Sequence, residues 1–139
     1  MEKVTVLIVE DDPVSSFLAQ NVLKLIGLDK QLYTAKNGKE ALEIFNRCFC
    51  GEIGMPDLIL LDLKMPVMDG FQFIQAYQKL QFLHKEKVLI VVTTSSVDDH
   101  DIDRAEELGI KYYLEKPISE VVLKSIIYEE MGFQLPNVA

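Results

Sequence analysis

The sequence predicts an α/β fold, (βα)5, in which five parallel strands form one doubly wound sheet and a helix follows each strand. Short apolar runs alternate with amphipathic stretches along the chain, as expected of repeated strand–helix units. Two of the apolar runs show no polar alternation, which is typical of strands that helices cover on both faces. Glycine, proline and asparagine punctuate the sequence where turns are needed.

The predicted strands are short, and the first and third are almost wholly apolar. The five strands are expected at Val4–Val9, Gln31–Thr34, Leu58–Leu61, Val88–Val92 and Lys111–Leu114. Right-handed crossovers between parallel strands limit how such a sheet can be wound.

The first two helices have clear starting signals. Asp12 predicts an N-cap, with Pro13 at the first helical position, and Gly27 predicts the end of this helix. Its apolar residues at helical spacing are Val14, Phe17, Leu18, Val22 and Leu25. A turn at Asn37-Gly38 precedes the second helix, whose apolar residues are Ala41, Leu42 and Phe45.

Apolar stripes predict the last three helices. Asp69-Gly70 predicts the turn that starts the third helix, and Gly109 ends a fourth helix rich in acids, expected to face solvent. The stripes of these two helices are Phe73, Ile74, Tyr77 and Leu80, and then Ile102, Ala105 and Leu108. The fifth helix is expected over Ile118–Glu130, with Val122, Ile126 and Ile127 inside.

Length and composition fit one globular domain. The chain has 139 residues, of which 49% are hydrophobic and 26% charged. No apolar run approaches the roughly 20 residues of a membrane helix, and the N-terminus lacks signal-peptide anatomy. We therefore expect a cytoplasmic domain over residues 1–131, a short tail over 132–139 and no output domain.

The formal net charge of −8 argues against direct binding to nucleic acid or to anionic membranes, since both would repel the chain. Cys48 and Cys50 are too few and too close for a disulfide scaffold, and we expect ordinary reduced residues near a helix end. His84 and His100 do not follow strands and are expected to be solvated.

Polar residues gather after four of the predicted strands. In an open parallel sheet, ligands bind at the carboxyl ends of the strands, where the winding direction reverses. The segments at those ends are Glu10-Asp11-Asp12, Asp62, Thr93-Thr94-Ser95-Ser96 and Glu115-Lys116-Pro117. One edge of the sheet thus collects carboxylates, hydroxyls and a single lysine.

This set of side chains predicts a phosphoryl site. Two carboxylates about 4 Å apart repel by roughly 4 kcal/mol at an effective dielectric constant near 20, so the edge needs a cation. All-oxygen ligands suit Mg²⁺, which also takes waters and a substrate phosphate. A lysine and hydroxyls can bind the phosphoryl oxygens, and an aspartate can act as the nucleophile.

The motifs resemble those of the receiver domain of bacterial two-component response regulators. They are Val6–Pro13 (VLIVEDDP), Leu60–Gly70 (LLDLKMPVMDG) and Tyr113–Pro117 (YLEKP). The resemblance runs from Val4 to about Tyr128 and implies a flavodoxin-like sheet of strand order 2-1-3-4-5. It also implies a stand-alone phosphoacceptor that is not an enzyme, although its own phosphoryl group can be lost slowly.

The resemblance assigns the acidic residues. Asp62 is expected to take the phosphoryl group from a sensor histidine kinase or a histidine phosphotransfer protein. Glu10 and Asp11 match the acidic pair that holds Mg²⁺, with Asp11 as a direct ligand and Glu10 acting through water. Asp62 and the backbone carbonyl of Lys64 complete the expected metal set. The Lys64 side chain lies at the mouth of the site, where it can shield or crowd the phosphoryl group.

The resemblance also assigns the switch. Lys116 is expected to pair with Asp62 and then with the phosphoryl group, and its bond to Pro117 is expected to be cis. Thr94 and Tyr113 match the switch pair, which changes the face made by the fourth helix, fifth strand and fifth helix. That face would signal to a protein partner, with the chain either monomeric or dimeric on phosphorylation.

Several alternatives stay open at this point. Asp12 is explained by helix capping, and Thr93 competes with Thr94 for the switch position. A haloacid-dehalogenase-type phosphatase would want an aspartate where Lys64 stands. A flavodoxin-like electron carrier would need a glycine- and hydroxyl-rich turn in place of the acids after the first strand. A degenerate receiver used only for docking is the third alternative.

Overall fold

A computed structural model describes residues 4–95 and 98–132 and shows one parallel sheet with the strand order β2-β1-β3-β4-β5. The strands are β1 (Thr5–Val9), β2 (Gln31–Ala35), β3 (Leu58–Asp62), β4 (Leu89–Thr94) and β5 (Tyr112–Glu115). The predicted fold class and strand order are confirmed. Ser96 and the predicted tail beyond Gly132 lie outside the described residues.

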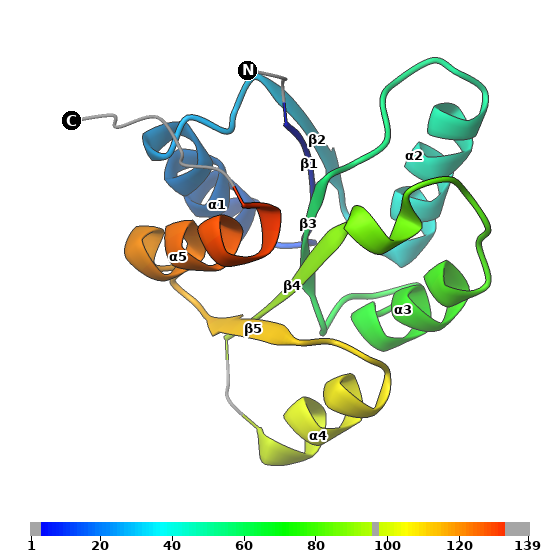
Figure 1. Cartoon of the computed structure of the whole chain (residues 1–139). Coiled ribbons are helices and arrows are strands. Elements are labelled where there is room, and N and C mark those ends of the chain that lie inside the picture. The colour runs from blue at the N-terminus through cyan, green and yellow to red at the C-terminus, as the bar shows by residue number, and fades with distance from the viewer. Residues whose placement is uncertain (1–3, 96–97, 133–139) are drawn as a thin grey trace.

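Helices cover both faces of the sheet (Figure 1). They are α1 (Pro13–Leu25), α2 (Gly38–Phe49), α3 (Gly70–Gln78), α4 (Asp99–Glu107) and α5 (Glu120–Met131), with a short 3-10 helix η1 (Lys85–Lys87) before β4. α1 and α5 pack on one face, and α2 and α3 on the other, with α4 beside β5. None of the helices in the described ranges is long and apolar enough to cross a membrane.

Side-chain caps fix where the helices begin. Asp12 accepts a hydrogen bond from the backbone N–H of Ser15 at the start of α1, and the predicted cap is confirmed. Asp69 and Gln72 form a reciprocal capping box at the start of α3. These caps end the loops that follow β1 and β3, and so limit the freedom of the residues at those strand ends.

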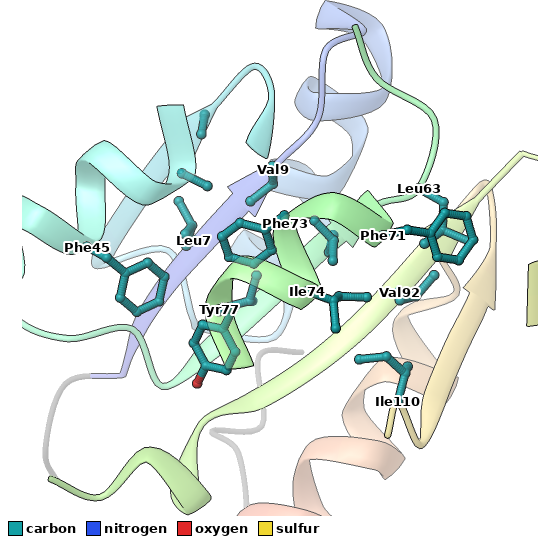
Figure 2. Packing of buried hydrophobic residues seen from close by; sticks show 14 of the residues in the cluster. Leu7, Val9, Phe45, Leu63, Phe71, Phe73, Ile74, Tyr77, Val92 and Ile110 are labelled. Atoms are coloured by element: carbon teal, nitrogen blue, oxygen red, sulfur yellow. The ribbon is translucent and has the colours of Figure 1, made fainter. Parts of the chain in front are cut away.

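The core consists of two layers, one on each face of the sheet. Along β1, Leu7 and Val9 point toward α2 and α3, whereas Val6 and Ile8 point toward α1 and α5, as expected of a strand buried on both faces. Figure 2 shows the first layer, in which Phe45 packs near several other aromatic rings. Its ring centroid lies 5.5 Å from that of Tyr77 and 6.3 Å from that of Phe73.

Two predicted apolar faces are wrong in part. Several predicted apolar residues of α1 are exposed, namely Val14, Phe17, Leu18 and Leu25. Ala19 and Leu23 of this helix, and Ile26 directly after it, are buried instead. In α5, Val122 is 44% exposed, and Leu123 takes its place in the core beside Ile126 and Ile127. Apolar residues occur around most of each helix, so spacing alone did not select the buried side.

Gly70 is held against the end of β3. A Cβ at this position would lie 2.5 Å from the carbonyl oxygen of Asp62 and 2.8 Å from Cα of Leu63. Both neighbours are backbone atoms, so the clash cannot be relieved by a side-chain rotation. Gly70 therefore allows the start of α3 to pack directly on the strand that ends in Asp62.

We predict that Gly70→Ala lowers the free energy of unfolding by about 1–3 kcal/mol, because backbone has to move to admit the methyl group. Gly54→Ala is the control, since the nearest described atom to its Cβ, Oγ1 of Thr5, would be 3.7 Å away. The control should change stability by no more than about 0.5 kcal/mol. Urea unfolding followed by circular dichroism measures both. An equal loss in the two variants would contradict the packing described for Gly70.

Candidate functional site

The predicted acidic residues converge at the carboxyl edge of the sheet. β1 and β3 are paired neighbours with Val9 opposite Leu61, so the next residues, Glu10 and Asp62, come side by side. Carboxylate oxygens of Glu10, Asp11 and Asp62 all lie within 4.8 Å of one another. Glu10 and Asp62 are buried, whereas Asp11 is exposed. The cluster is therefore open to solvent on the Asp11 side.

Lys116 supplies a cation inside this cluster. Its ammonium forms a short ion pair with Oε1 of Glu10 and lies 3.6 Å from Oδ1 of Asp62. The predicted neighbour Asp62 is present, but Glu10 is the closer partner. The backbone N–H of Lys116 donates to the carbonyl oxygen of Thr94 at 2.7 Å, which fixes the segment after β5 beside β4. The bond from Lys116 to Pro117 is cis, as expected.

The Glu10 carboxylate has a second partner. The backbone N–H of Asp12 donates to Oε2 of Glu10 at 3.2 Å, while Lys116 occupies Oε1. Both oxygens of this buried carboxylate are thus engaged, and its closest cation, Lys116, lies farther from Asp62.

The pKa of Asp62 is raised to about 7, and burial is the largest cause. The negative charge of Glu10 and a hydrogen bond with it contribute to this rise, while Lys116 and the backbone N–H of Lys64 oppose it. Near neutral pH, the Asp62 carboxyl therefore exchanges readily between its charged and neutral forms. A cation bound beside it would favour the charged, nucleophilic form.

The donor set fits Mg²⁺. Three carboxylates converge, all with oxygen donors, and one of them faces solvent, where waters can complete an octahedral shell. Asp11 and Asp62 would hold the ion, with Glu10 behind them. The backbone N–H of Lys64 is hydrogen-bonded to the Asp62 carboxyl, which places the Lys64 main chain at the site. A ligand from the Lys64 carbonyl stays a prediction.

Thr94 and Tyr113 lie beside a small cavity between β4, β5 and α4. Both residues line it, together with Leu63, Val92 and Asp101 among others. Thr93 instead lines a cleft with Glu10 and Lys116 on the other side of β4. Thr94 therefore shares space with Tyr113, and Thr93 does not. This arrangement favours Thr94 over Thr93 as the neighbour of Tyr113.

The Tyr113 side chain is hydrogen-bonded to α4. Its hydroxyl donates to Oε1 of Glu106 on α4 at 2.6 Å, and this bond is the main reason the pKa of Tyr113 is raised. The sequence did not suggest Glu106, because the acids of α4 look like a solvated face. The spacing of the acids carries no signal that would select Glu106 as the partner of Tyr113.

Asp101 also differs from the prediction that the acids of α4 face solvent. It is only 8% exposed, and its Oδ2 lies 3.2 Å from the ammonium of Lys64. His100, in contrast, is exposed, as is His84, which agrees with their predicted solvation. Cys48 is a buried free thiol near the end of α2 and Cys50 an exposed one, as expected of reduced cysteines.

Comparison with known proteins gives a consistent result. The family model described as the response regulator receiver domain matches residues 6–128. The chain is 35% identical to two-component response regulator ARR22 of Arabidopsis thaliana over 124 residues, which cover 89% of this chain and 81% of the relative. It is 30% identical to a probable chemotaxis protein CheY of Rhizobium etli, covering 94% of this chain and 95% of that protein.

Solved structures share the fold. A two-component response regulator from Cytophaga hutchinsonii superposes with a TM-score of 0.83 at 22% identity, covering 96% of this chain and 100% of the other. The bacteriophytochrome response regulator AtBRR superposes with a TM-score of 0.78 at 29% identity, covering 96% of each chain. The similarity thus extends over the sheet, the helices and the loops at its carboxyl edge.

The raised pKa of Asp62 predicts a pH dependence of stability. Between the ordinary carboxyl pKa of 3.8 and about 7, the folded state holds a proton on Asp62 that the unfolded state has lost. The contribution of this residue to stability therefore falls as pH rises through that window. Without metal, Asp62→Asn should gain on the order of 3 kcal/mol over the wild type between pH 4 and pH 8.

Urea unfolding in EDTA at several pH values checks this, with Asp99→Asn as the control for an exposed aspartate. The difference between Asp62→Asn and the wild type should be smallest at pH 4 and largest at pH 8. A difference that does not depend on pH would contradict the raised pKa.

Magnesium should stabilise the protein through this cluster. At a concentration about 100 times its dissociation constant, a bound ion adds about 2.7 kcal/mol to the free energy of unfolding. We expect a rise of that order for the wild type at pH 8 and little or none for Asp11→Asn. Asp12→Asn, which keeps a helix cap, should respond like the wild type. Thermal unfolding against Mg²⁺ concentration measures this, and a full response in Asp11→Asn would contradict the ligand assignment.

Proposed function

This chain belongs to the response regulator receiver domain family of two-component signalling, and on that premise we propose that it accepts a phosphoryl group on Asp62 from a phosphohistidine donor. One observation carries the proposal. Asp62 is a buried carboxylate with a raised pKa, and it lies beside two further acids and one lysine at the carboxyl edge of the sheet. A carboxylate in this setting is costly without a role.

Each residue of the cluster has a part in the proposed transfer. Asp62 attacks the phosphorus in line, the phosphorus–nitrogen bond of the donor breaks, and the donor imidazole keeps that electron pair. Lys116 turns from Glu10 toward the phosphoryl oxygens, since its ammonium already lies 3.6 Å from Asp62. Mg²⁺, when bound by Asp11 and Asp62, offsets the negative charge that gathers on those oxygens.

The signal would leave through Thr94 and Tyr113. A phosphoryl group on Asp62 offers acceptor oxygens to the Thr94 hydroxyl. Movement of Thr94 toward Asp62 would enlarge the cavity that Thr94 and Tyr113 line together, and Tyr113 could then turn inward and leave Glu106. The surface formed by α4, β5 and α5 would change, which is a two-state shift driven by a local charge.

A donor would find an apolar surface beside the site. Val14 and Phe17 on α1 are 64% and 61% exposed. Leu18 on the same helix lines the cleft that contains Glu10 and Lys116, so this surface adjoins the acidic cluster. Exposed apolar residues gathered in this way are typical of protein interaction sites. They support contact with a histidine kinase or histidine phosphotransfer protein, rather than with a small substrate alone.

The competing functions have less support. A phosphatase of the haloacid-dehalogenase type would need an acid where Lys64 stands, and the Lys64 side chain points to α4 instead. A flavin phosphate would meet Glu10 and Asp11 at the end of β1. A cytoplasmic location and a monomer or phosphorylation-dependent dimer stay predictions.

The proposal is tested by incubating the protein with acetyl phosphate and Mg²⁺ and recording its intact mass. We expect one base-labile phosphoryl adduct on the wild type and none on Asp62→Asn or in EDTA, because the acceptor and the cation are both needed. Asp57→Asn, at an exposed aspartate before β3, is the matched control and should be phosphorylated like the wild type.

An adduct that survives in Asp62→Asn would place the acceptor elsewhere. If no adduct forms with acetyl phosphate or with several histidine kinases as donors, the chain keeps a receiver fold without the chemistry. The docking-only alternative would then become the better explanation.

A further inference from the structure

Lys64 connects the acidic cluster to α4. Its backbone N–H is hydrogen-bonded to the Asp62 carboxyl, while its ammonium lies 3.2 Å from Oδ2 of Asp101. The same residue therefore touches the candidate phosphoacceptor through its main chain and a helix through its side chain. Among the ion pairs of the described residues, this is the one that reaches α4.

Asp101 differs from the other acids of its helix. Asp98, Asp99 and Asp103 are exposed, whereas the side chain of Asp101 is 12% exposed. Its Oδ2 accepts no aligned hydrogen bond from any described residue, so the ammonium of Lys64 is an ion-pair partner without hydrogen-bond geometry. Asp101 also lines the cavity that Thr94 and Tyr113 line.

The position of Asp101 near the start of α4 favours a negative charge, because the amino end of a helix carries a partial positive charge. That effect would stabilise an exposed acid equally well and does not explain why this one is buried. A buried carboxylate still needs a counter-ion or hydrogen bonds. Lys64 is the cation in place to meet that need.

We propose that Asp101 is a positioning residue that holds the Lys64 ammonium at the rim of the site, and that a phosphoryl group on Asp62 competes for this ammonium. The inference rests on the proposed function of Asp62. A phosphoryl group carries about −1.5 to −2 charges near neutral pH, more than one carboxylate. Lys64 is 65% exposed on a flexible four-carbon stem, so its ammonium is free to change partners.

The exchange would uncover a buried charge on α4. When Lys64 turns to the phosphoryl group, Asp101 loses its counter-ion and the first turn of α4 has to loosen to hydrate it. Phosphorylation would thus reach α4 by a second route, separate from Thr94 and Tyr113. Since such coupling is reciprocal, the pairing with Asp101 also weakens binding of a phosphoryl-like anion at Asp62.

A double-mutant cycle tests the exchange, with beryllofluoride and excess Mg²⁺ as the phosphoryl mimic. We expect Asp101→Asn to bind the mimic about three- to tenfold more tightly than the wild type, because Lys64 no longer has to leave a partner. In the Lys64→Gln background, the same change should alter affinity by less than about twofold. Asp99→Asn removes the same charge from an exposed neighbour and should not reproduce the effect.

A second readout concerns the helix itself. Hydrogen–deuterium exchange of α4 should rise on binding in the wild type and not in Asp101→Asn, since an asparagine needs no counter-ion. A merely structural role for Asp101 would change exchange with and without the mimic equally. Lys64→Gln alters an exposed side chain, so it remains informative if Asp101→Asn proves unstable to urea. It should bind the mimic about three- to tenfold more weakly than the wild type.

The outcomes separate this inference from the proposed function. If the wild type does not bind the mimic, or if Asp62→Asn binds it equally, the function proposed for Asp62 fails. If binding requires Asp62 but Asp101→Asn has the same effect with and without Lys64, only the inference about Asp101 is overturned. Equal effects of Asp99→Asn and Asp101→Asn would also overturn it, because long-range charge alone would then explain the change.

Discussion

Glu10 and Asp62 are two buried carboxylates on neighbouring strands, and the rest of the site depends on how their charges are offset. At about 4 Å and an effective dielectric constant near 20, such a pair repels by roughly 4 kcal/mol. Lys116 lies between them and is held in place by its backbone hydrogen bond to Thr94. The cluster still has an excess of negative charge, which fits a divalent cation and adds to the effect of burial in raising the pKa of Asp62.

This arrangement follows from the order of the strands. Chain segments distant in sequence supply Glu10, Asp62 and Lys116. They meet because β1, β3 and β5 belong to one parallel sheet, with β1 beside β3, and each of the three residues comes at the carboxyl end of its strand. Caps at Asp12 and Asp69 then stop the loops within a few residues of the two strand ends. The positions of the charges are therefore fixed by backbone pairing together with these side-chain caps.

The fold and the contents of the acidic edge could be predicted from the sequence, because both depend on local patterns. Apolar runs locate strands, Asp12 and Pro13 locate a helix start, and residues just after parallel strands share one edge. The buried face of α1 could not be predicted, since Phe17 and Leu18 are as apolar as Leu23 and only packing separates them.

The contacts of α4 could not be predicted for a different reason. Asp101 and Glu106 belong to a run of acids that has the pattern of a solvated helix face. Their partners, Lys64 and Tyr113, come from other elements, and the register between helix and strand decides which acid meets which partner. Long-range side-chain pairing of this kind leaves no mark on local spacing.

Under the proposed function, these two contacts would link a single added charge at Asp62 to a distant surface. The chain carries a formal net charge of −8, and the lysines near the site already have acidic partners. Lys116 lies between Glu10 and Asp62, and the Lys64 ammonium pairs with Asp101 on α4. In the proposed function, a new anion at Asp62 would draw on one of these lysines. Because α4 is held through Asp101 and Glu106, it is the element whose partners change when those cations and Tyr113 move. A packed interface of this type has discrete arrangements rather than a continuous range, so the proposed phosphorylation would convert a local charge into a shift between two surfaces.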